Sequence, residues 1–105
     1  MAFLKFLNTA ELEEFSIGLA TDLGRRFPPA SESRTDPGAS HQLKVILEGL
    51  AARAVRYHDQ KRLGIYGKAK LGNVFKWKLT ELGYSKSFVE RATKELVTRL
   101  AVRKK

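Results

Sequence analysis

The sequence predicts an all-α protein that forms a single compact bundle of four main helices. Apolar residues recur at spacings of three and four in four separate stretches, which is the period of a helix with one buried face. No stretch alternates apolar and polar residues as a half-buried strand would. The chain has 105 residues, of which 43% are hydrophobic and 30% charged, so it can form one modest core. We therefore expect residues 1–105 to form one helical domain.

The first helix is predicted over about residues 9–26. Asn8 can cap it, and Glu11 stands three residues later, where a capping box places its acid. Its apolar stripe consists of Leu12, Phe15, Leu19, Leu23 and Phe27. The prolines at 28–29 end it because proline cannot continue a helix. Residues 3–7 could form one further short helical turn.

Residues 28–40 read PPASESRTDPGAS, and this segment predicts a flexible loop because it is rich in Pro, Ser and Gly and has no apolar run. A second helix is predicted over about 41–62. Its stripe consists of Leu43, Ile46, Leu47, Leu50, Ala54 and Tyr57. Gly64 follows it and suits the left-handed backbone that often ends a helix.

A third helix is predicted over about 67–82 and a fourth over about 86–101, beginning at a Ser85 or Ser87 cap. Their stripes are Leu71, Phe75, Leu79 and Leu82 in the third and Val89, Ala92, Leu96 and Leu100 in the fourth. Trp77 points roughly opposite the third stripe, so it is either packed on a second side or exposed. Packing is the expected outcome because tryptophan is usually highly buried. The basic tail 102–105 is expected to fray.

Positive charge is concentrated in the second half of the chain. The formal net charge is +9, yet residues 1–60 carry 7 Lys and Arg against 8 Asp and Glu, whereas residues 61–105 carry 13 against 3. Such a concentration attracts polyanions, so we expect nucleic acid as a partner, with DNA favoured over RNA. The alternative is that these side chains only solubilise the exposed helix faces.

Residues 82–96 read LGYSKSFVERATKEL and resemble the turn and second helix of the helix-turn-helix in bacterial regulators. The matching residues are Gly83, Ser85, Val89 and Ala92. The resemblance implies a DNA-reading corner at about 75–94, although Leu79 stands where the motif has a small residue. The corner is also similar to that of ubiquitin-binding three-helix folds, so a purely structural corner remains the other interpretation.

Residues 64–78 read GIYGKAKLGNVFKWK and contain three glycines, four lysines and three aromatic residues. The GxxG at 64–67 resembles the backbone clamp of KH domains, which implies binding of single-stranded nucleic acid. The sheet of those domains is not predicted here. Tyr66 and Trp77 could stack on unpaired bases, the alternative being that both are packed.

Taken together, the pattern predicts phosphate contacts from the basic residues, with two serines positioning the nucleic-acid backbone and one tryptophan stacking. The candidate nucleic-acid-binding residues are Lys68, Lys70, Lys76, Trp77, Ser85, Lys86, Ser87, Arg91 and Lys94. The competing hypothesis is a protein-interaction or assembly module, either a homodimer or a domain that binds an acidic protein, with no role in nucleic-acid binding.

Catalytic and metal-binding patterns are missing from the sequence. There is no cysteine, and the two histidines, His41 and His58, do not have the spacing of a metal-binding pair. We therefore expect no enzyme activity, no metal site and no cofactor. No apolar stretch approaches the roughly 18 to 20 residues of a membrane span, and MAFLKFL lacks the features of a signal peptide. These features predict a cytoplasmic protein with no membrane partner.

Overall fold

The computed structural model describes residues 9–101 and confirms an all-α four-helix bundle. Its elements are α1 (Thr9–Arg26), the short 3-10 helix η2 (Pro29–Ser33), α2 (Pro37–Lys61), α3 (Gly64–Leu82) and α4 (Lys86–Ala101). The described range contains no strand. The expected turn at 3–7, the Asn8 cap and the tail at 102–105 lie outside the described residues.

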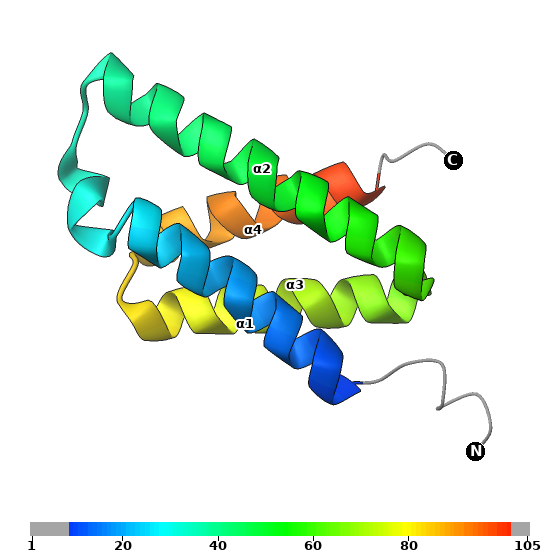
Figure 1. Ribbon diagram of the computed structural model, residues 1–105. Helices are drawn as coiled ribbons and strands as arrows, with labels where there is room; N and C mark the ends of the chain where they lie inside the picture. Colours follow the sequence, from blue (N-terminus) through cyan, green and yellow to red (C-terminus); the bar gives the residue numbers. More distant parts are fainter. Residues whose placement is uncertain (1–8, 102–105) are drawn as a thin grey trace.

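The helices form a closed ring of neighbours. Helix α1 packs on α3, α3 on α4, α4 on α2, and α2 returns to α1. Figure 1 shows α3 and α4 lying side by side and running in opposite directions, with α1 crossing α3 on its other side. Helices α1 and α4 therefore cover two sides of α3, and a third side of α3 faces solvent.

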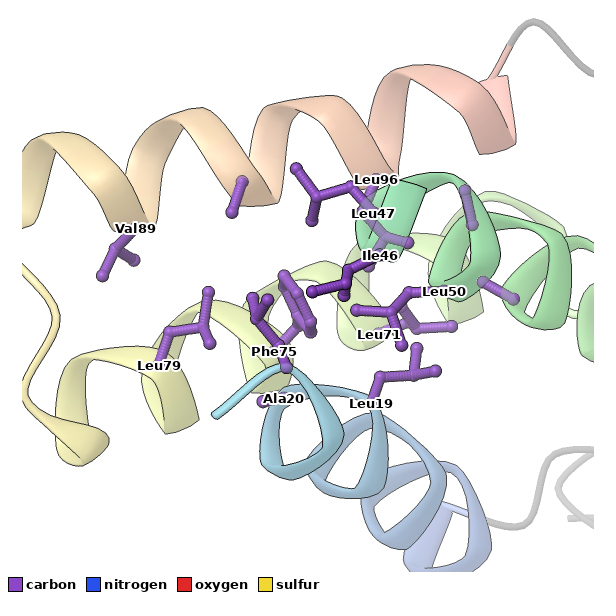
Figure 2. Close-up of a cluster of buried hydrophobic side chains, with 14 of the residues drawn as sticks. Leu19, Ala20, Ile46, Leu47, Leu50, Leu71, Phe75, Leu79, Val89 and Leu96 are labelled. Carbon is purple, nitrogen blue, oxygen red and sulfur yellow. The ribbon is translucent and has the colours of Figure 1, made fainter. Parts of the chain in front are cut away.

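The core lies where the apolar stripes of the four helices meet. Leu71, Phe75 and Leu79 of α3 are fully buried and point toward side chains from the three other helices (Figure 2). The buried partners that Figure 2 labels are Leu19, Ala20, Ile46, Leu47, Leu50, Val89 and Leu96. Each large apolar side chain taken out of water contributes about 1.5–3 kcal/mol to folding. The apolar stripes predicted from the sequence are the residues that form this core. Phe15, Tyr57 and Leu82 are partly buried and pack at the edge of the core.

Two helices begin earlier than the sequence pattern predicts. Helix α2 begins at Pro37 instead of about residue 41, because the Asp36 carboxylate caps it by accepting a hydrogen bond from the Ala39 N–H at 3.0 Å. Proline suits the first position of a helix, since the N–H it lacks would have no partner there. Helix α3 begins at Gly64 instead of about 67. The loop predicted over 28–40 is accordingly shorter and contains η2, while its flexibility stays a prediction.

The corner between α2 and α3 uses two residues with a positive φ angle. Arg62 ends α2 at φ 55°, and its N–H donates to the His58 carbonyl at 2.8 Å. Gly64 also has a positive φ, 69°, but it is the first residue of α3, and the left-handed residue that ends α2 is Arg62 instead of Gly64. The backbone therefore reverses within a few residues, and α3 begins directly after α2.

The corner between α3 and α4 is anchored to the end of α1. Gly83, at φ 108°, ends α3, with its N–H bonded to the Thr80 carbonyl and the Tyr84 N–H bonded to the Leu79 carbonyl. The Tyr84 hydroxyl then donates to the Phe27 carbonyl at the end of α1. These contacts fix where α4 starts relative to α1 and α3.

Stacked rings reinforce the same corner. The Tyr84 ring stacks on Phe88 with centroids 4.5 Å apart, and Phe88 lies parallel to Phe27 at 6.1 Å. All three residues are buried. The start of α4 is thus held by apolar packing as well as by hydrogen bonds.

We predict that alkaline destabilisation depends on Tyr84. Burial, together with the nearby charge of Glu32, raises the pKa of Tyr84 from 10.0 to about 12. Its contribution to stability is therefore complete below pH 10 and is lost as the pH rises toward about 12. Tyr84→Phe should cost about 1 kcal/mol near pH 7 through the lost hydrogen bond. Above pH 10 the stability of the Tyr84→Phe variant should fall less steeply than that of the wild type.

Thermal unfolding at a series of pH values from neutral to alkaline measures both effects. Burial also raises the pKa of Tyr57, so a smaller alkaline decline should persist in the variant. Parallel declines of the wild type and Tyr84→Phe would contradict the role given to Tyr84.

Candidate functional site

The outer side of α3 carries an exposed stripe that lies opposite its buried one. Tyr66, Lys70, Asn73 and Trp77 are spaced by four, three and four residues, so they lie within about 60° of one another around the helix. Tyr66 is 78% exposed and Trp77 54% exposed. The packing expected for Trp77 from the sequence is therefore wrong, because α1 and α4 cover other sides of α3 and leave this one to solvent.

A hollow of about 350 Å³ separates the exposed surfaces of α3 and α4. It is lined by Lys76 and Thr80 from α3 and by Lys86 and Glu90 from α4, above the buried Tyr84 and Val89. The antiparallel course of the two helices brings the two lysines to one place. Neither lysine forms an ion pair with another residue in 9–101. Two lysines and one acid, Glu90, therefore meet at this hollow, which leaves it with a net positive charge.

Lys94 extends the positive surface along α4. It follows Lys86 by eight residues, which places it about 80° further around α4; it is exposed and has no ion pair within the described part of the chain. We call the surface formed by these exposed residues of the two helices the α3/α4 face. Its residues are Tyr66, Lys70, Asn73, Lys76, Trp77, Lys86, Glu90 and Lys94.

The other two lysines predicted on α3 differ in their position. Lys70 belongs to the exposed stripe, although its Nζ lies 3.3 Å from a Glu13 carboxylate oxygen of α1. A pair this exposed contributes at most about 1 kcal/mol, so Lys70 can exchange its partner. Lys68 precedes Trp77 by about two and a half turns and so lies on the opposite side of α3. It does not join the α3/α4 face.

Ser87 and Arg91 face a different part of the molecule. Both line a hollow of about 350 Å³ between α4 and the start of α2, which Arg34 and Asp36 border from the other side. Arg91 also borders the adjoining hollow toward Lys44. The sequence grouped these residues with Lys86 and Lys94, but the turn of α4 directs them toward α2.

Ser85 caps α4 and is held by a residue that no local sequence pattern indicates as its partner. Its hydroxyl accepts the Phe88 N–H at 3.2 Å, while its own N–H and hydroxyl both donate to the Glu32 carboxylate at 2.7 Å. Glu32 belongs to η2. A carboxylate already occupies the position where a phosphate would meet the start of α4, so Ser85 serves the fold here.

The corner at 82–86 joins a helical hairpin. A β-carbon on Gly72 would lie 2.9 Å from Val97 Cγ2, and both residues are far from the corner. The two helices thus remain in contact for about 15 Å, given a rise of about 1.5 Å per residue. In a helix-turn-helix the two helices diverge at about 90–120°. The geometry favours the structural interpretation of this corner.

Metal-binding clusters and membrane-spanning helices are the two further features considered among the described residues. Nowhere in 9–101 do three His, Asp or Glu side chains gather closely enough to hold a metal ion. Helices α1 to α4 are all too short or too polar to cross a membrane. The candidate site is therefore the α3/α4 face, which combines exposed aromatic rings, an exposed amide and unpaired lysines.

We predict that Ser85→Ala lowers the free energy of unfolding by about 1 kcal/mol through loss of the cap. Glu32→Ala should destabilise as well, and the double variant should lose less than the sum because the two residues share one interaction. Thr98→Ala, the matched control at an exposed hydroxyl of α4 with no hydrogen bond in the described part of the chain, should stay within about 0.5 kcal/mol of the wild type. Urea unfolding measures all four proteins. Additive losses would show that the Glu32–Ser85 contact contributes nothing.

Comparison with known proteins identifies no relative of this chain. The chain matches no protein-family model, no curated protein and no solved structure.

Proposed function

We propose that the protein binds nucleic acid through the α3/α4 face. The observation that carries this proposal is the exposure of Tyr66 and Trp77 on one stripe, beside lysines that have no partner within the described residues. Proteins that bind single strands combine aromatic rings, on which bases stack, with cations that follow the phosphates. The α3/α4 face offers both kinds of group on one side of the molecule.

The charges of this face support the proposal. Lys76, Lys86 and Lys94 are uncompensated, and Glu90 is the acid that lies among them. Glu81, at the end of α3, is neutralised by Lys78 at 2.8 Å. The net potential is therefore positive, which draws a polyanion to the surface and orients it there.

Unpaired strands fit this surface better than a duplex. A duplex reader presents the exposed start of a helix to the major groove, but here Glu32 covers the start of α4. Ring faces can stack on a base only when the base is free of its own stack. The exposed rings thus favour single-stranded DNA or RNA.

A second candidate is an assembly module, and one observation favours it. Ile65 is 83% exposed and lies next to Tyr66 at the corner between α2 and α3. Large exposed apolar groups often mark protein contacts. Sedimentation over a range of protein concentrations tests this candidate, since a dimer that buries Ile65 and Tyr66 should dissociate on substituting Ile65→Ser.

Charge reversal tests the nucleic-acid proposal directly. Lys76→Glu combined with Lys86→Glu should weaken binding of a labelled single strand by more than about tenfold at low salt, because two phosphate contacts become repulsive. With three or four phosphates neutralised, the log–log salt slope of the wild type should be about −2 to −3. Fluorescence anisotropy measures both quantities.

The matched control is Lys44→Glu combined with Lys68→Glu, which changes the net charge equally but away from the α3/α4 face. It should retain most of the wild-type affinity. Equal losses in the two double variants would show that binding follows net charge alone, and the proposed face would then be wrong.

A further inference from the structure

The exposed stripe of α3 contains a hollow of its own at the start of the helix. Its volume is about 240 Å³, and it is lined by Thr9 of α1 and by Tyr66, Ala69, Lys70 and Asn73 of α3. Ala69 lies between Tyr66 and Asn73 on the helix, and its short side chain leaves the space between them open. Drug-sized ligands occupy about 300–1,000 Å³, so this hollow suits a single flat ring system.

Two side chains that border the hollow are open to contact with a ligand. The Tyr66 ring is almost fully exposed, so one face of it is available for stacking. The Asn73 amide is exposed and has no hydrogen-bond partner among residues 9–101. An amide carries both a donor and an acceptor, and on adenine it can bond N6–H and N7 at the same time.

Charge distinguishes this hollow from the one between Lys76 and Lys86. Lys70 is the cation at its rim, and Glu13 already neutralises it at 3.3 Å. A phosphate placed here would meet the Glu13 carboxylate, whereas a neutral ring would not. The groups on its walls therefore fit a neutral, flat, hydrogen-bonding ligand.

We propose that this hollow holds one unpaired base of a single-stranded nucleic acid, stacked on Tyr66 and read at its edge by the Asn73 amide. Adenine is the base that the amide matches best. Trp77 stacks on a different base, because the 11 positions between it and Tyr66 correspond to about 16 Å along the helix, several times the 3.4 Å rise of a stacked strand. The inference rests on the nucleic-acid function proposed above and specifies its ligand.

The test compares three labelled strands of equal length by fluorescence anisotropy at low salt: oligodeoxyadenylate, oligodeoxycytidylate and an abasic strand. The abasic strand has the same phosphates and no bases. The wild type should bind the adenine strand about a hundredfold more tightly than the abasic one, since the abasic strand lacks both the base on Tyr66 and the base on Trp77, and each contributes about tenfold. It should bind the cytosine strand with intermediate affinity.

Variants of the hollow assign the preference to its residues. Tyr66→Ala should lose about tenfold on the adenine strand and nothing on the abasic strand. Asn73→Leu, which keeps the size of the side chain and suits a helix, should remove most of the preference for adenine over cytosine. The control Val45→Ala removes a 47% exposed apolar side chain from α2 and should change neither affinity. Circular dichroism verifies that each variant is folded.

The outcomes separate this inference from the function on which it rests. Equal binding of the abasic and adenine strands would overturn the base-binding hollow and leave phosphate binding in place. A preference for adenine over cytosine that survives Tyr66→Ala and Asn73→Leu would also overturn it, since adenine would then be recognised elsewhere. Absence of binding to every strand at low salt would overturn both proposals.

Discussion

The α3/α4 face depends on two contacts that fasten the corner between α3 and α4 to the connection between α1 and α2. The Tyr84 hydroxyl bonds the Phe27 carbonyl, and Ser85 is held by Glu32 through its N–H and its hydroxyl. These contacts join segments that are 57 and 53 residues apart in the chain. They determine where α4 begins, and thereby bring Lys86 to the same hollow as Lys76.

The same arrangement explains why α3 exposes aromatic rings. Gly72 allows α4 to lie close along one side of α3, where any larger residue would meet Val97, and α1 covers another side. The buried stripe of Leu71, Phe75 and Leu79, with Leu82 at the edge of the core, faces away from these two rings. Tyr66 and Trp77 remain outside the core, and large apolar groups that a fold leaves exposed in one row point to contact with a ligand or a partner.

The helices and their buried stripes could be predicted from the sequence because both follow from local periodicity. The start of α2 has a local signal, because Asp36 is a good cap and Pro37 a favoured first residue, but the Pro, Ser and Gly around them favour a loop in the sequence pattern. The spacing of Tyr66, Lys70, Asn73 and Trp77 could also be predicted. Their exposure could not, because it depends on which sides of α3 the other helices cover.

In the candidate site, too, some features follow from neighbouring residues in the sequence and others from contacts between distant segments. The sequence predicts Lys68 and Lys70 as parts of one binding site, but the helix directs these two side chains to different sides. Nothing local to Ser85 indicates Glu32 as its partner, since that contact exists only once the bundle has formed. The sequence does contain a pattern that indicates Asn73 as a site residue, because this polar residue lies at helical spacing between two aromatic residues, Tyr66 and Trp77.

The most direct measurement is a titration of the protein with a mixed-sequence single strand, followed by the emission of Trp77, its one tryptophan, at low and at moderate salt. Binding at the α3/α4 face predicts a saturable quench, because a base that stacks on the ring contacts the reporter itself. The apparent affinity should fall as salt rises, since phosphate contacts release counterions. An unchanged emission at low salt, or a quench that does not respond to salt, would contradict the account.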